Sequence, residues 1–592
     1  MNQQPASGAV NSVQRVRVWY ALLLLVFGLF ALRVFYLQVI RYDYYKKAAA
    51  SDQLKQYEVP ASRGVISAQL GDGTVPIVLN QKLYTLYADP TIVKNPGTVA
   101  AKLQPIIGGK VDDIEKLLKT KDTRYVVLGK KLTPAQNTKI LAFKFPGVGT
   151  QEQDYRTYPQ GSLASQLLGF VNNDGQGEYG VEQALNKQLA GKPGQLKAVT
   201  DINGVPLAAS SNNLSTAPVA GDDVDLTINV GMQRQVEQIL AQSSSQFHAQ
   251  GIGAVVLDAN TGAVKAMANY PTYNPADYQN VSNPALFQNL TVSEPIEMGS
   301  IMKTLTTATA LNEGVIQEDS SFYDPGSWTI DDSVISDVSI DHSKGQQNIG
   351  TVLDLSLNTG ATWMLMQLGG GQLNAKGRDT LHDYLVNHYM LGKATGIEQG
   401  YEASGYVPSP KDNGAGINLT WANVSFGQAV TATALQMASA ISSALTGTYY
   451  QPYLVDSITS GSTVHHTSPK VVKRNVVSSA TSHDLQTLME YVVTEHVKEG
   501  YPYMRFSPNY IVGGKTGSAE VAMPSGGYSP TEINGTYAGF VGGDKPQYVI
   551  VVYEILPHIT PGYFAGAHVA QPVFADIAHM LIDDFGVTPK SH

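Results

Sequence analysis

The sequence has no cysteine, and only 15% of its 592 residues are charged. The lack of cysteine excludes a disulfide scaffold, a thiolate zinc site, an iron–sulfur cluster and a cysteine nucleophile. Basic residues are also scarce, since 40 Lys and Arg face 49 Asp and Glu, a net charge of −9. We therefore expect no nucleic-acid partner, because nucleic acids require a basic surface. The 12 histidines are scattered, with His465-His466 in a polar stretch typical of a surface loop, so we expect no metal and no other cofactor.

One long apolar run is present, at residues 18–40, and only Arg33 interrupts it. As a single helix this run would extend about 34 Å at 1.5 Å per residue, which is enough to cross a bilayer. A buried core helix and a cleaved signal peptide are the alternatives. The run is long for a signal peptide, and Lys46-Lys47 separates it from the small residues Ala48, Ala49 and Ala50. We therefore predict an uncleaved transmembrane anchor.

The charges around this run give little information on its orientation. Arg15 and Arg17 precede it, whereas Arg41, Lys46 and Lys47 follow it, so the positive-inside signal is weak. A short inner tail with a large outer domain is the common single-pass arrangement. We expect residues 1–17 to be a cytoplasmic tail and the rest of the chain to be extracytoplasmic.

The remaining sequence predicts a mixed α/β protein. Residues 41–221 combine short strands, turns and a helix near 111–119, and the small polar stretch 212–221 is typical of a linker. Alternating apolar residues predict hairpins at 252–257 with 264–268 and at 537–541 with 548–556. A helix pattern follows at 570–582. Strands from both ends of the region 222–592 would thus form one central antiparallel sheet, with a helix-rich insertion between them.

Ser300 and Lys303 form an S-x-x-K pattern at the start of a segment that Gly314 would end as a helix. Residues i and i+3 are neighbours on a helix, so Lys303 would lie beside Ser300. Free N–H groups at the helix start can stabilise a developing anion. Lys303 could deprotonate Ser300 if burial and a second cation lowered the pKa of the amine.

Two further motifs follow in the chain. Ser356 and Asn358, in an S-L-N triplet at a helix start or tight turn, offer a hydroxyl for proton relay and an amide that can hold a peptide. Lys515-Thr516-Gly517-Ser518 lies in a glycine-rich strand, where the ammonium and two hydroxyls could hold a carboxylate. Glycines in a strand allow close approach of another backbone, so we expect Gly513, Gly514 and Gly517 to admit the substrate.

The three motifs in this order resemble those of the penicillin-recognising serine acyltransferases. The resemblance covers nearly the whole chain and points to the class B penicillin-binding proteins, in particular their division-specific (septal) branch, with elongation-type relatives as the alternative. The stretches that carry it outside the three motifs are Arg63-Gly64-Val65-Ile66, Arg156, Tyr158-Pro159, Gly169, 177–182, Thr395-Gly396-Ile397, 402–405 and 425–431. Three positions depart from the usual pattern: Met298 stands where proline is common, Ser518 where threonine is commoner, and Ala429 where glycine is usual.

The resemblance implies a penicillin-binding transpeptidase fold behind a transmembrane helix at 18–40, with a pedestal (dimerisation-type) domain at 41–221 and a transpeptidase domain at 222–592. It implies a serine D,D-transpeptidase that cross-links peptidoglycan stem peptides from D-Ala-D-Ala through an acyl-enzyme. The implied catalytic residues are Ser300, Lys303, Ser356, Asn358 and Lys515. The implied substrate-binding residues are Thr516, Gly517 and Ser518, and the backbone N–H groups of Ser300 and Ser518 would form the oxyanion hole.

The expected partners are stem peptides on lipid-linked precursor or nascent glycan, β-lactam antibiotics, a membrane glycosyltransferase and division proteins. The expected location is the bacterial cytoplasmic membrane, with the catalytic domain outside. A β-lactam-binding sensor and a β-lactamase of the same fold are the competing interpretations. The intact Ser300, Lys303 and Lys515 argue against a retired site, and the anchor with its large pre-catalytic segment favours cell-wall synthesis.

Overall fold

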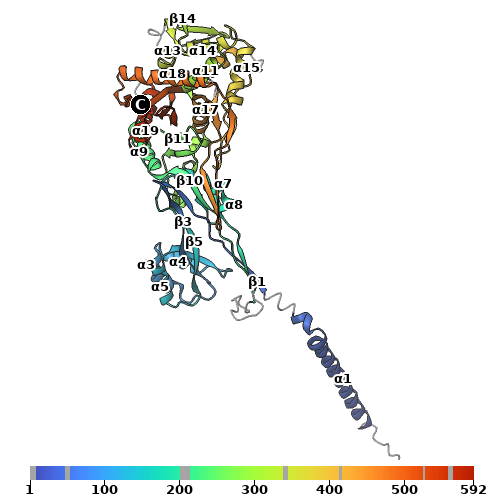
Figure 1. Cartoon of the computed structure of the whole chain (residues 1–592). Coiled ribbons are helices and arrows are strands. Elements are labelled where there is room, and N and C mark those ends of the chain that lie inside the picture. Colours follow the sequence, from blue (N-terminus) through green and yellow to red (C-terminus); the bar gives the residue numbers. More distant parts are fainter. Residues whose placement is uncertain are drawn as a thin grey trace, which may run out of the picture. The chain divides into compact units, whose positions relative to one another are not determined.

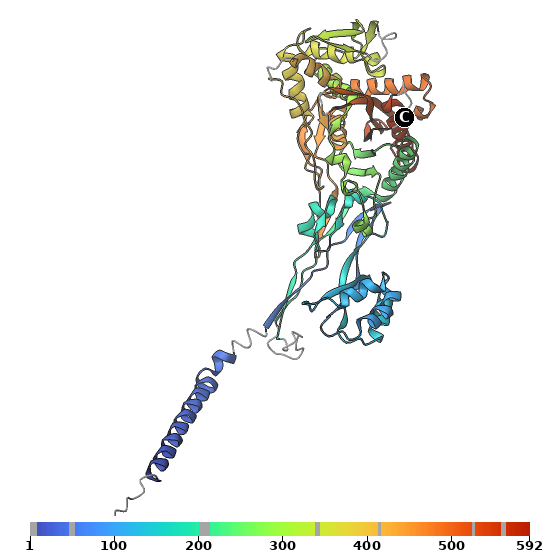
Figure 2. The ribbon, with the colours of Figure 1, turned by 180° about the vertical axis from the view of Figure 1, so that it is seen from behind.

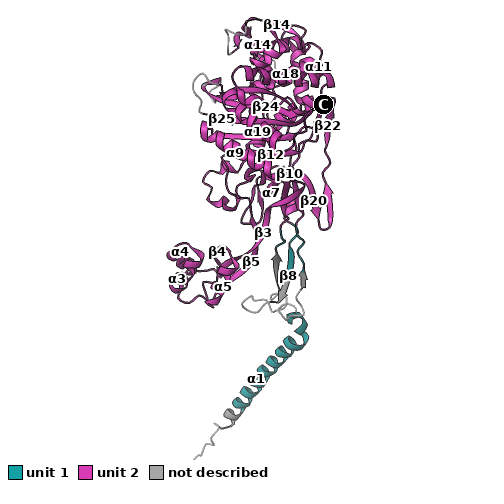
Figure 3. Cartoon of the chain, turned by 60° about the vertical axis from the view of Figure 1, so that its left-hand side comes forward, with its two compact units in different colours: residues 1–62, 191–220 teal, residues 63–190, 221–592 magenta. Residues whose placement is uncertain are grey.

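The computed structural model describes residues 9–46, 54–199, 214–337, 344–411, 416–523, 527–557 and 564–591. The chain divides into two compact units, coloured separately in Figure 3. Unit 1 comprises residues 1–62 and 191–220, and unit 2 comprises residues 63–190 and 221–592.

Unit 1 contains the apolar helix and a small sheet. Helix α1 (Ala9–Phe35) continues into the π-helical turn η1 (Tyr36–Ile40), and the stretch Gln14–Ile40 is long and apolar enough to cross a membrane, with mean hydropathy 2.2 and no buried residue in its apolar window. The sheet has the order β1 (Leu54–Val59), β8 (Gly194–Val199), β9 (Leu214–Thr216). Strand β9 lies within the predicted linker 212–221, so that part of the linker prediction is wrong; residues 212 and 213 lie outside the described residues.

A long mixed sheet runs through unit 2 in the order β21-β20-β10-β2-β3-β4, with β5 also paired to β3. Its strands β10 and β2 are parallel neighbours. One sheet therefore contains strands from both sides of the predicted domain boundary after residue 221. His465 and His466 lie in an exposed strand, β21, and not in a loop. The bounds are β2 (Ile66–Leu70), β3 (Gly73–Ala88), β4 (Val126–Leu132), β5 (Val148–Thr157), β10 (Asp223–Asn229), β20 (Val455–Ser460) and β21 (Thr463–His466).

The far ends of β3, β4 and β5 carry three helices with their own apolar core (Figure 1). Leu103, Ile114 and Leu118 pack there against Leu86 and Leu132 of the strands. The helices are α3 (Pro96–Ile107), α4 (Val111–Leu118) and α5 (Pro134–Ala142), and α4 matches the helix predicted near 111–119.

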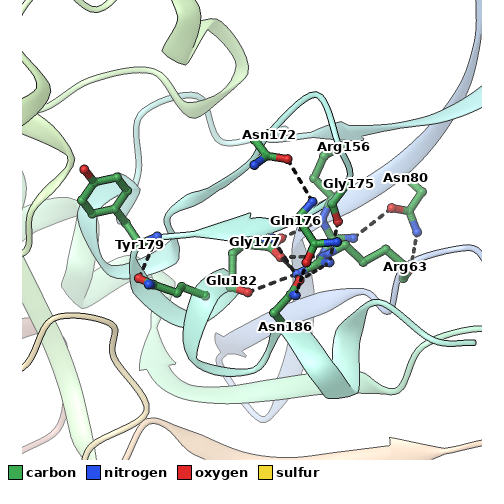
Figure 4. A network of polar contacts seen from close by, with 11 residues as sticks. Arg63, Asn80, Arg156, Asn172, Gly175, Gln176, Gly177, Tyr179, Glu182 and Asn186 are labelled. Carbon is green, nitrogen blue, oxygen red and sulfur yellow. Dashed lines mark hydrogen bonds and ion pairs between the residues drawn. The ribbon is translucent and has the colours of Figure 1, made fainter.

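In the same unit, an arginine–glutamate network joins residues far apart in the chain (Figure 4). Glu182, fully buried in α7 (Gly180–Ala184), accepts hydrogen bonds from Arg63 Nε and Arg156 Nε, both at 2.7 Å. Arg156 Nη1 also donates to Asn80 Oδ1 at 2.9 Å, and Asn80 Nδ2 donates to the carbonyl of Arg63. Arg63, Arg156 and Glu182, which lie in three of the stretches that resemble the family, thus form one cluster of ion pairs and hydrogen bonds.

The central sheet of the region 222–592 has five antiparallel strands in the order β12-β11-β25-β24-β23. The two predicted hairpins are confirmed. The alternation of side chains divides the core: Val255 and Val551 join one apolar cluster, and Val256 and Ile550 join the other. The bounds are β11 (Gly251–Asp258), β12 (Val264–Tyr270), β23 (Ile511–Ala522), β24 (Tyr528–Gly542) and β25 (Pro546–Ile555).

Helices cover both faces of this sheet, as Figures 1 and 2 show. Helices α9 (Val230–Phe247) and α19 (Gln571–Asp584) pack on one face, and α19 follows the π-helical turn η7 (Gly566–Ala570) near the predicted 570–582. The insertion covers the other face with α17 (Ala434–Thr446) and α18 (Ser479–Lys498). Its helices α11 (Met302–Asn312), α13 (Ile349–Asp354), α14 (Asn358–Leu368) and α16 (Ile417–Ser425) pack on these two helices or on one another. It also contains short two-stranded ladders, which the sequence did not predict, at β13 (Ile296–Glu297), β14 (Ser321–Asp324), β15 (Ser327–Ile330), β16 (Ser333–Ser336), β17 (Gly345–Asn348) and β18 (Thr431–Ala432).

Candidate active site

Ser300 lies in a short 3₁₀ turn, η4 (Gly299–Ile301), which leads directly into α11. The predicted helix start is therefore confirmed, and Gly314 follows the helix with a left-handed φ of 66°. Gly299 has a φ of 56° and lies so close to strand β23 that a Cβ would come within 2.6 Å of the Ser518 carbonyl oxygen. The nucleophile candidate is thus held against the K-T-G strand by a glycine that no larger residue could replace.

Lys303 is completely buried and surrounded by oxygen acceptors. Its Nζ is 3.0 Å from Ser300 Oγ, 3.2 Å from Ser356 Oγ, 2.6 Å from the Ser356 carbonyl oxygen and 2.8 Å from Asn358 Oδ1. The ring of Phe426 lies 5.9 Å from the same nitrogen. The structure therefore brings together the four residues that two separate motifs supplied.

The turn that carries Ser356 and Asn358 connects α13 to α14. Ser356 has a left-handed φ of 57°, which is uncommon for a residue with a side chain. Asn358 Nδ2 donates to the carbonyl of Ser336 at 3.1 Å, and Asp337 accepts from Thr359 through both its backbone N–H (3.0 Å) and its hydroxyl (2.6 Å). Sequence reasoning missed Asp337, because its role depends on a contact that no local spacing predicts.

Lys515 extends from β23 and is also completely buried. Its Nζ donates to Thr516 Oγ1 at 3.1 Å. Thr516 and Ser518 lie on the same face of the strand and stay partly exposed, and Ser518 Oγ accepts from the backbone N–H of Gly566 at 3.1 Å. The two hydroxyls are accessible to a ligand, while the lysine acts from beneath the surface.

The glycines of this strand serve a purpose different from the expected one. A Cβ on Gly517 would lie 2.2 Å from Thr536 Oγ1 and 2.7 Å from the Met298 carbonyl oxygen. A Cβ on Gly513 would meet Phe540, and one on Gly514 would meet Tyr537. The glycines therefore leave room for neighbouring segments of the protein itself. The position of strand β23 against Ser300 depends on this close packing.

Burial and mutual repulsion set the charges of the two lysines. Burial lowers the pKa of Lys303 well below its usual value, and the nearby charge of Lys515 lowers it further, as predicted, while Asp337 opposes the shift. Burial also lowers the pKa of Lys515 to about 7, against the opposing influence of Asp354 and Glu499. We expected Lys515 to stay charged, but near neutral pH the ammonium and the free amine are both populated.

A partly buried carboxyl supports the loop beside Ser300. Glu297 Oε1 accepts from the backbone N–H of Ala429 at 2.8 Å and from Tyr528 OH at 3.1 Å. Burial raises the pKa of Glu297. Met298, which stands where proline is common, is buried, and its carbonyl accepts from Thr536 Oγ1 at 2.8 Å. The departure from the usual sequence thus leaves the nucleophile's support intact.

Comparison with known proteins gives a consistent result. Residues 252–579 match the family model of the penicillin-binding protein transpeptidase domain, and residues 58–226 match that of the penicillin-binding protein dimerisation domain. The chain is 30% identical to penicillin-binding protein PbpB of Mycolicibacterium smegmatis, over 83% of this chain and 73% of that protein. It is 28% identical to peptidoglycan D,D-transpeptidase FtsI of Escherichia coli K12, over 94% and 90% respectively.

Solved structures show the same fold. Penicillin-binding protein 3 of Mycobacterium tuberculosis, solved in complex with aztreonam, superposes with a TM-score of 0.66 at 23% identity, over 90% of this chain and 98% of that one. The transpeptidase match alone covers more than half of the present chain. With a buried lysine in its S-x-x-K motif, S-L-N and K-T-G motifs beside it and a preceding dimerisation domain, this chain belongs to the class B penicillin-binding proteins.

Proposed function

We propose that Ser300 is the nucleophile and Lys303 the general base of a serine D,D-transpeptidase that cross-links peptidoglycan stem peptides. The observation that carries the proposal is the 3.0 Å contact between Lys303 Nζ and Ser300 Oγ, made by an amine whose pKa burial lowers well below its usual value. A neutral amine has a free lone pair, so it can accept the proton of Ser300 as the hydroxyl attacks a carbonyl.

In the first step, Ser300 Oγ bonds to the carbonyl carbon of the penultimate D-Ala, and its proton passes to Lys303. The backbone N–H groups of Ser300 and Ser518 would stabilise the oxyanion. The peptide bond to the terminal D-Ala then breaks, and Ser356 relays a proton to the leaving amine. Its Oγ, 3.2 Å from Lys303 Nζ, is within reach of the proton that Lys303 has accepted.

In the second step, the amine of a neighbouring stem peptide attacks the ester of the acyl-enzyme. Lys303 and Ser356 remove a proton from that amine, and Ser300 leaves as the free hydroxyl. No nucleotide is consumed, because the D-Ala-D-Ala bond supplies the free energy. We assign Asn358 to holding the donor peptide through its amide, which Ser336 and Lys303 orient.

Lys515, Thr516 and Ser518 would bind the terminal carboxylate of the donor, with Gly517 setting their position. The partial exposure of the two hydroxyls and the buried ammonium behind them support this assignment. A penicillin carries a carboxylate and a strained amide, so we propose that β-lactams acylate Ser300 in the same way. The aztreonam complex of the M. tuberculosis neighbour supports this extension.

A fluorescent penicillin tests the reaction class. A stoichiometric adduct on Ser300 that persists for many minutes, together with amine-dependent cross-linking of a D-Ala-D-Ala peptide, is the expected result. Rapid release of the label would instead indicate a β-lactamase, and a stable adduct without peptide turnover would indicate a sensor.

We also propose the cellular arrangement. Residues 1–17 would lie in the cytoplasm, 18–40 would cross the membrane, and the pedestal (41–221) would carry the transpeptidase domain (222–592) outside. A septal role, with a membrane glycosyltransferase and division proteins as partners, fits the resemblance to division-specific relatives. Protease added outside wall-permeable cells should degrade the large domain; its survival would reverse the assigned orientation.

A further inference from the structure

The hairpin of β15 and β16 carries none of the three motifs, yet it is hydrogen-bonded to the first turn of α14. The amide nitrogen of Asn358, which begins this helix, donates to the carbonyl of Ser336 at 3.1 Å. Asp337, directly after the hairpin, accepts from the backbone N–H of Thr359 at 3.0 Å and from its hydroxyl at 2.6 Å. Trp328 Nε1 donates to the carbonyl of Thr359 at 3.1 Å. The hairpin is thus bonded to both residues that open α14.

The sequence of α14 explains why its first turn needs an acceptor from elsewhere in the chain. The N-cap residue, Leu357, has no polar side chain, so it cannot bind the free N–H groups of the first turn. Asp337 takes this place from 22 residues away, and only 3% of it is exposed. Breaking either of its bonds would leave a buried polar group unpaired, which is costly. Asp337 therefore fixes the helix start that carries Asn358.

The Ser336 carbonyl decides which end of the Asn358 amide faces Lys303. A carbonyl oxygen only accepts hydrogen bonds, so it binds the amide nitrogen and leaves Asn358 Oδ1 for Lys303 Nζ, 2.8 Å away. The reverse orientation would place two oxygens against each other at Ser336. It would also let the amide N–H donate to the lysine amine and occupy the lone pair that a base needs.

The partners of Lys303 then fix the direction of that lone pair. A neutral amine carries two N–H groups and a lone pair. Asn358 Oδ1 and the Ser356 carbonyl oxygen, at 2.8 and 2.6 Å, can only accept, so they bind the N–H groups. The lone pair is left for the hydroxyls of Ser300 and Ser356, at 3.0 and 3.2 Å. The orientation of the Asn358 amide thus aims the proposed base at the proposed nucleophile.

We propose that Asp337 is a positioning residue for acyl transfer: by anchoring the hairpin to α14, it holds the Asn358 amide in the orientation that points the lone pair of the lysine amine at the nucleophile. This inference rests on the proposed function, in which Lys303 takes the proton of Ser300. It gives a hairpin outside the three motifs a part in preparing the base.

The test separates binding from acylation. Stopped-flow measurements with the full chain and a fluorescent penicillin give the dissociation constant of the first complex and the rate constant of acylation within it. For Asp337→Ala we expect the rate constant to fall about tenfold, part of the ~10²–10⁴-fold that a general base contributes, and the dissociation constant to stay within about twofold. Binding should persist because Lys515, Thr516 and Ser518 are unchanged. A merely structural role would weaken binding and acylation together, which would overturn the proposal.

Asp337→Asn distinguishes position from charge. The charge of Asp337 opposes the fall in the pKa of Lys303, so an electrostatic role is the rival explanation. Asparagine keeps an oxygen for the Thr359 N–H and has an amide that can donate to the Thr359 hydroxyl. It removes the charge and keeps the anchor, so the acylation rate constant should stay close to that of the wild-type protein. An asparagine variant as slow as the alanine variant would make the effect electrostatic and refute the positioning role.

A second aspartate on the same hairpin provides the matched control. Asp331, in the turn between β15 and β16, accepts from the backbone N–H of Leu419 in the first turn of α16 at 3.0 Å. The hydrogen bonds of Lys303 within the described residues go to other elements. Asp331→Ala should lower the melting temperature, since its left-handed φ of 48° also disfavours alanine, and should leave the acylation rate constant unchanged. An equal loss of acylation in this variant would overturn the proposal.

Two variants at position 359 keep the test decisive if Asp337→Ala does not fold. Thr359→Val keeps the branched shape but removes the hydroxyl that Asp337 binds, so the acylation rate constant should fall by less than in Asp337→Ala. Thr359→Ser keeps the hydroxyl and should keep the wild-type rate constant. Equal rate constants in both variants and the wild-type protein would refute the inference.

The same measurements separate this inference from the function on which it rests. If penicillin did not acylate Ser300 in the wild-type protein, the proposed function itself would fail. If penicillin acylated Ser300 with a rate constant that Asp337→Ala left unchanged, only the positioning role of Asp337 would fail.

Discussion

The arginine–glutamate network and the active site both bury basic side chains, and the two regions treat the charge of these side chains differently. In the arginine–glutamate network, Arg63 and Arg156 share the carboxylate of Glu182, with nitrogen–oxygen distances of 2.6–2.7 Å. In the active site, Lys303 Nζ forms hydrogen bonds to hydroxyl, carbonyl and amide oxygens, and the nearby charge of Lys515 lowers its pKa. A paired buried charge is retained, whereas an unpaired one is lost by a shift in pKa. The first arrangement suits a permanent structural ion pair, and the second suits the base that we propose for Lys303.

The difference follows from the side chains chosen. Arginine is effectively never deprotonated and binds carboxylates through a planar fork, which suits a permanent buried ion pair. Lysine has a compact ammonium whose pKa falls readily on burial. The chain therefore has arginine in the buried ion pairs with Glu182, and lysine at position 303, where we propose that a proton moves.

The largest effect should come from removing the Ser300 hydroxyl, which contacts Lys303 Nζ. Ser300→Ala should abolish covalent labelling by penicillin while leaving the melting temperature close to that of the wild-type protein, because the hydroxyl contributes one contact to a fully packed helix start. Intact-mass spectrometry measures the adduct. A stoichiometric adduct on the alanine variant would place the nucleophile elsewhere.

The next largest effect should separate the two lysines. Lys303→Arg replaces the proposed neutral amine with a permanent cation and so removes the base, and acylation should fall by about 10²–10⁴-fold, the usual contribution of general base catalysis. Lys515→Arg keeps the clamp's charge and should retain measurable acylation with weaker substrate binding. Acylation rates with a single β-lactam at pH 7 test this. Equal losses, or a greater loss at position 515, would contradict the assigned roles.

Breaking the arginine–glutamate network should lower the stability of the fold and leave the acylation reaction unchanged. Glu182→Gln leaves two buried arginines without a carboxylate, and removal of one partner from a buried ion pair costs about 3–5 kcal/mol. Urea unfolding followed by tryptophan fluorescence would measure the loss. The acylation rate per folded molecule should equal that of the wild-type protein, and a selective loss of acylation would show that the network also acts on the site.

The burial of Lys515 should make the stability of the fold depend on pH. The pKa of Lys515 is about 7 in the folded protein and near 10.5 when unfolded, so between these values the unfolded chain binds one more proton. The free energy of unfolding therefore rises with pH in this window, by up to about 1.4 kcal/mol per pH unit for this one group. Below pH 7 the lysine is charged in both states, so the full cost of burying its charge is present there. Methionine at position 515 does not titrate, so Lys515→Met lacks this pH dependence. The amount by which Lys515→Met exceeds the wild-type protein in unfolding free energy should therefore be smaller at pH 9 than at pH 7. A constant difference would mean that Lys515 remains charged.

Much of this arrangement could be predicted from the sequence, and the reasons for the failures are physical. Alternation predicted β11, β12 and β25, and the i to i+3 spacing placed Lys303 beside Ser300. These features depend on neighbours in the chain. The pairing of β2 with β10 and the capping of α14 by Asp337 depend on residues brought together by folding, so no local pattern predicted them.

The charge of Lys515 shows the same limit. The motif identifies a lysine that can hold a carboxylate, but its proton affinity depends on burial and on Asp354 and Glu499, more than 15 residues away in either case. The requirement for glycine at 517 was likewise recognised, but its cause is contact with Thr536 and Met298. Sequence identifies the chemistry available at a site, and packing determines its protonation state.

The smallest effect concerns strain beside the site, where Ala429 stands in place of the usual glycine. Ala429 has a left-handed φ of 59°, which costs an L-residue about 1–2 kcal/mol. Its N–H donates to Glu297, a contact that glycine would keep. Ala429→Gly should therefore stabilise the protein, by about 0.5–1 kcal/mol after the greater freedom of unfolded glycine is subtracted. Ala135→Gly, in the exposed first turn of α5, is the matched control and should lose up to about 1 kcal/mol. Paired melting temperatures in the same buffer measure both, and a loss of stability in both variants would show that the loop holds Ala429 without strain.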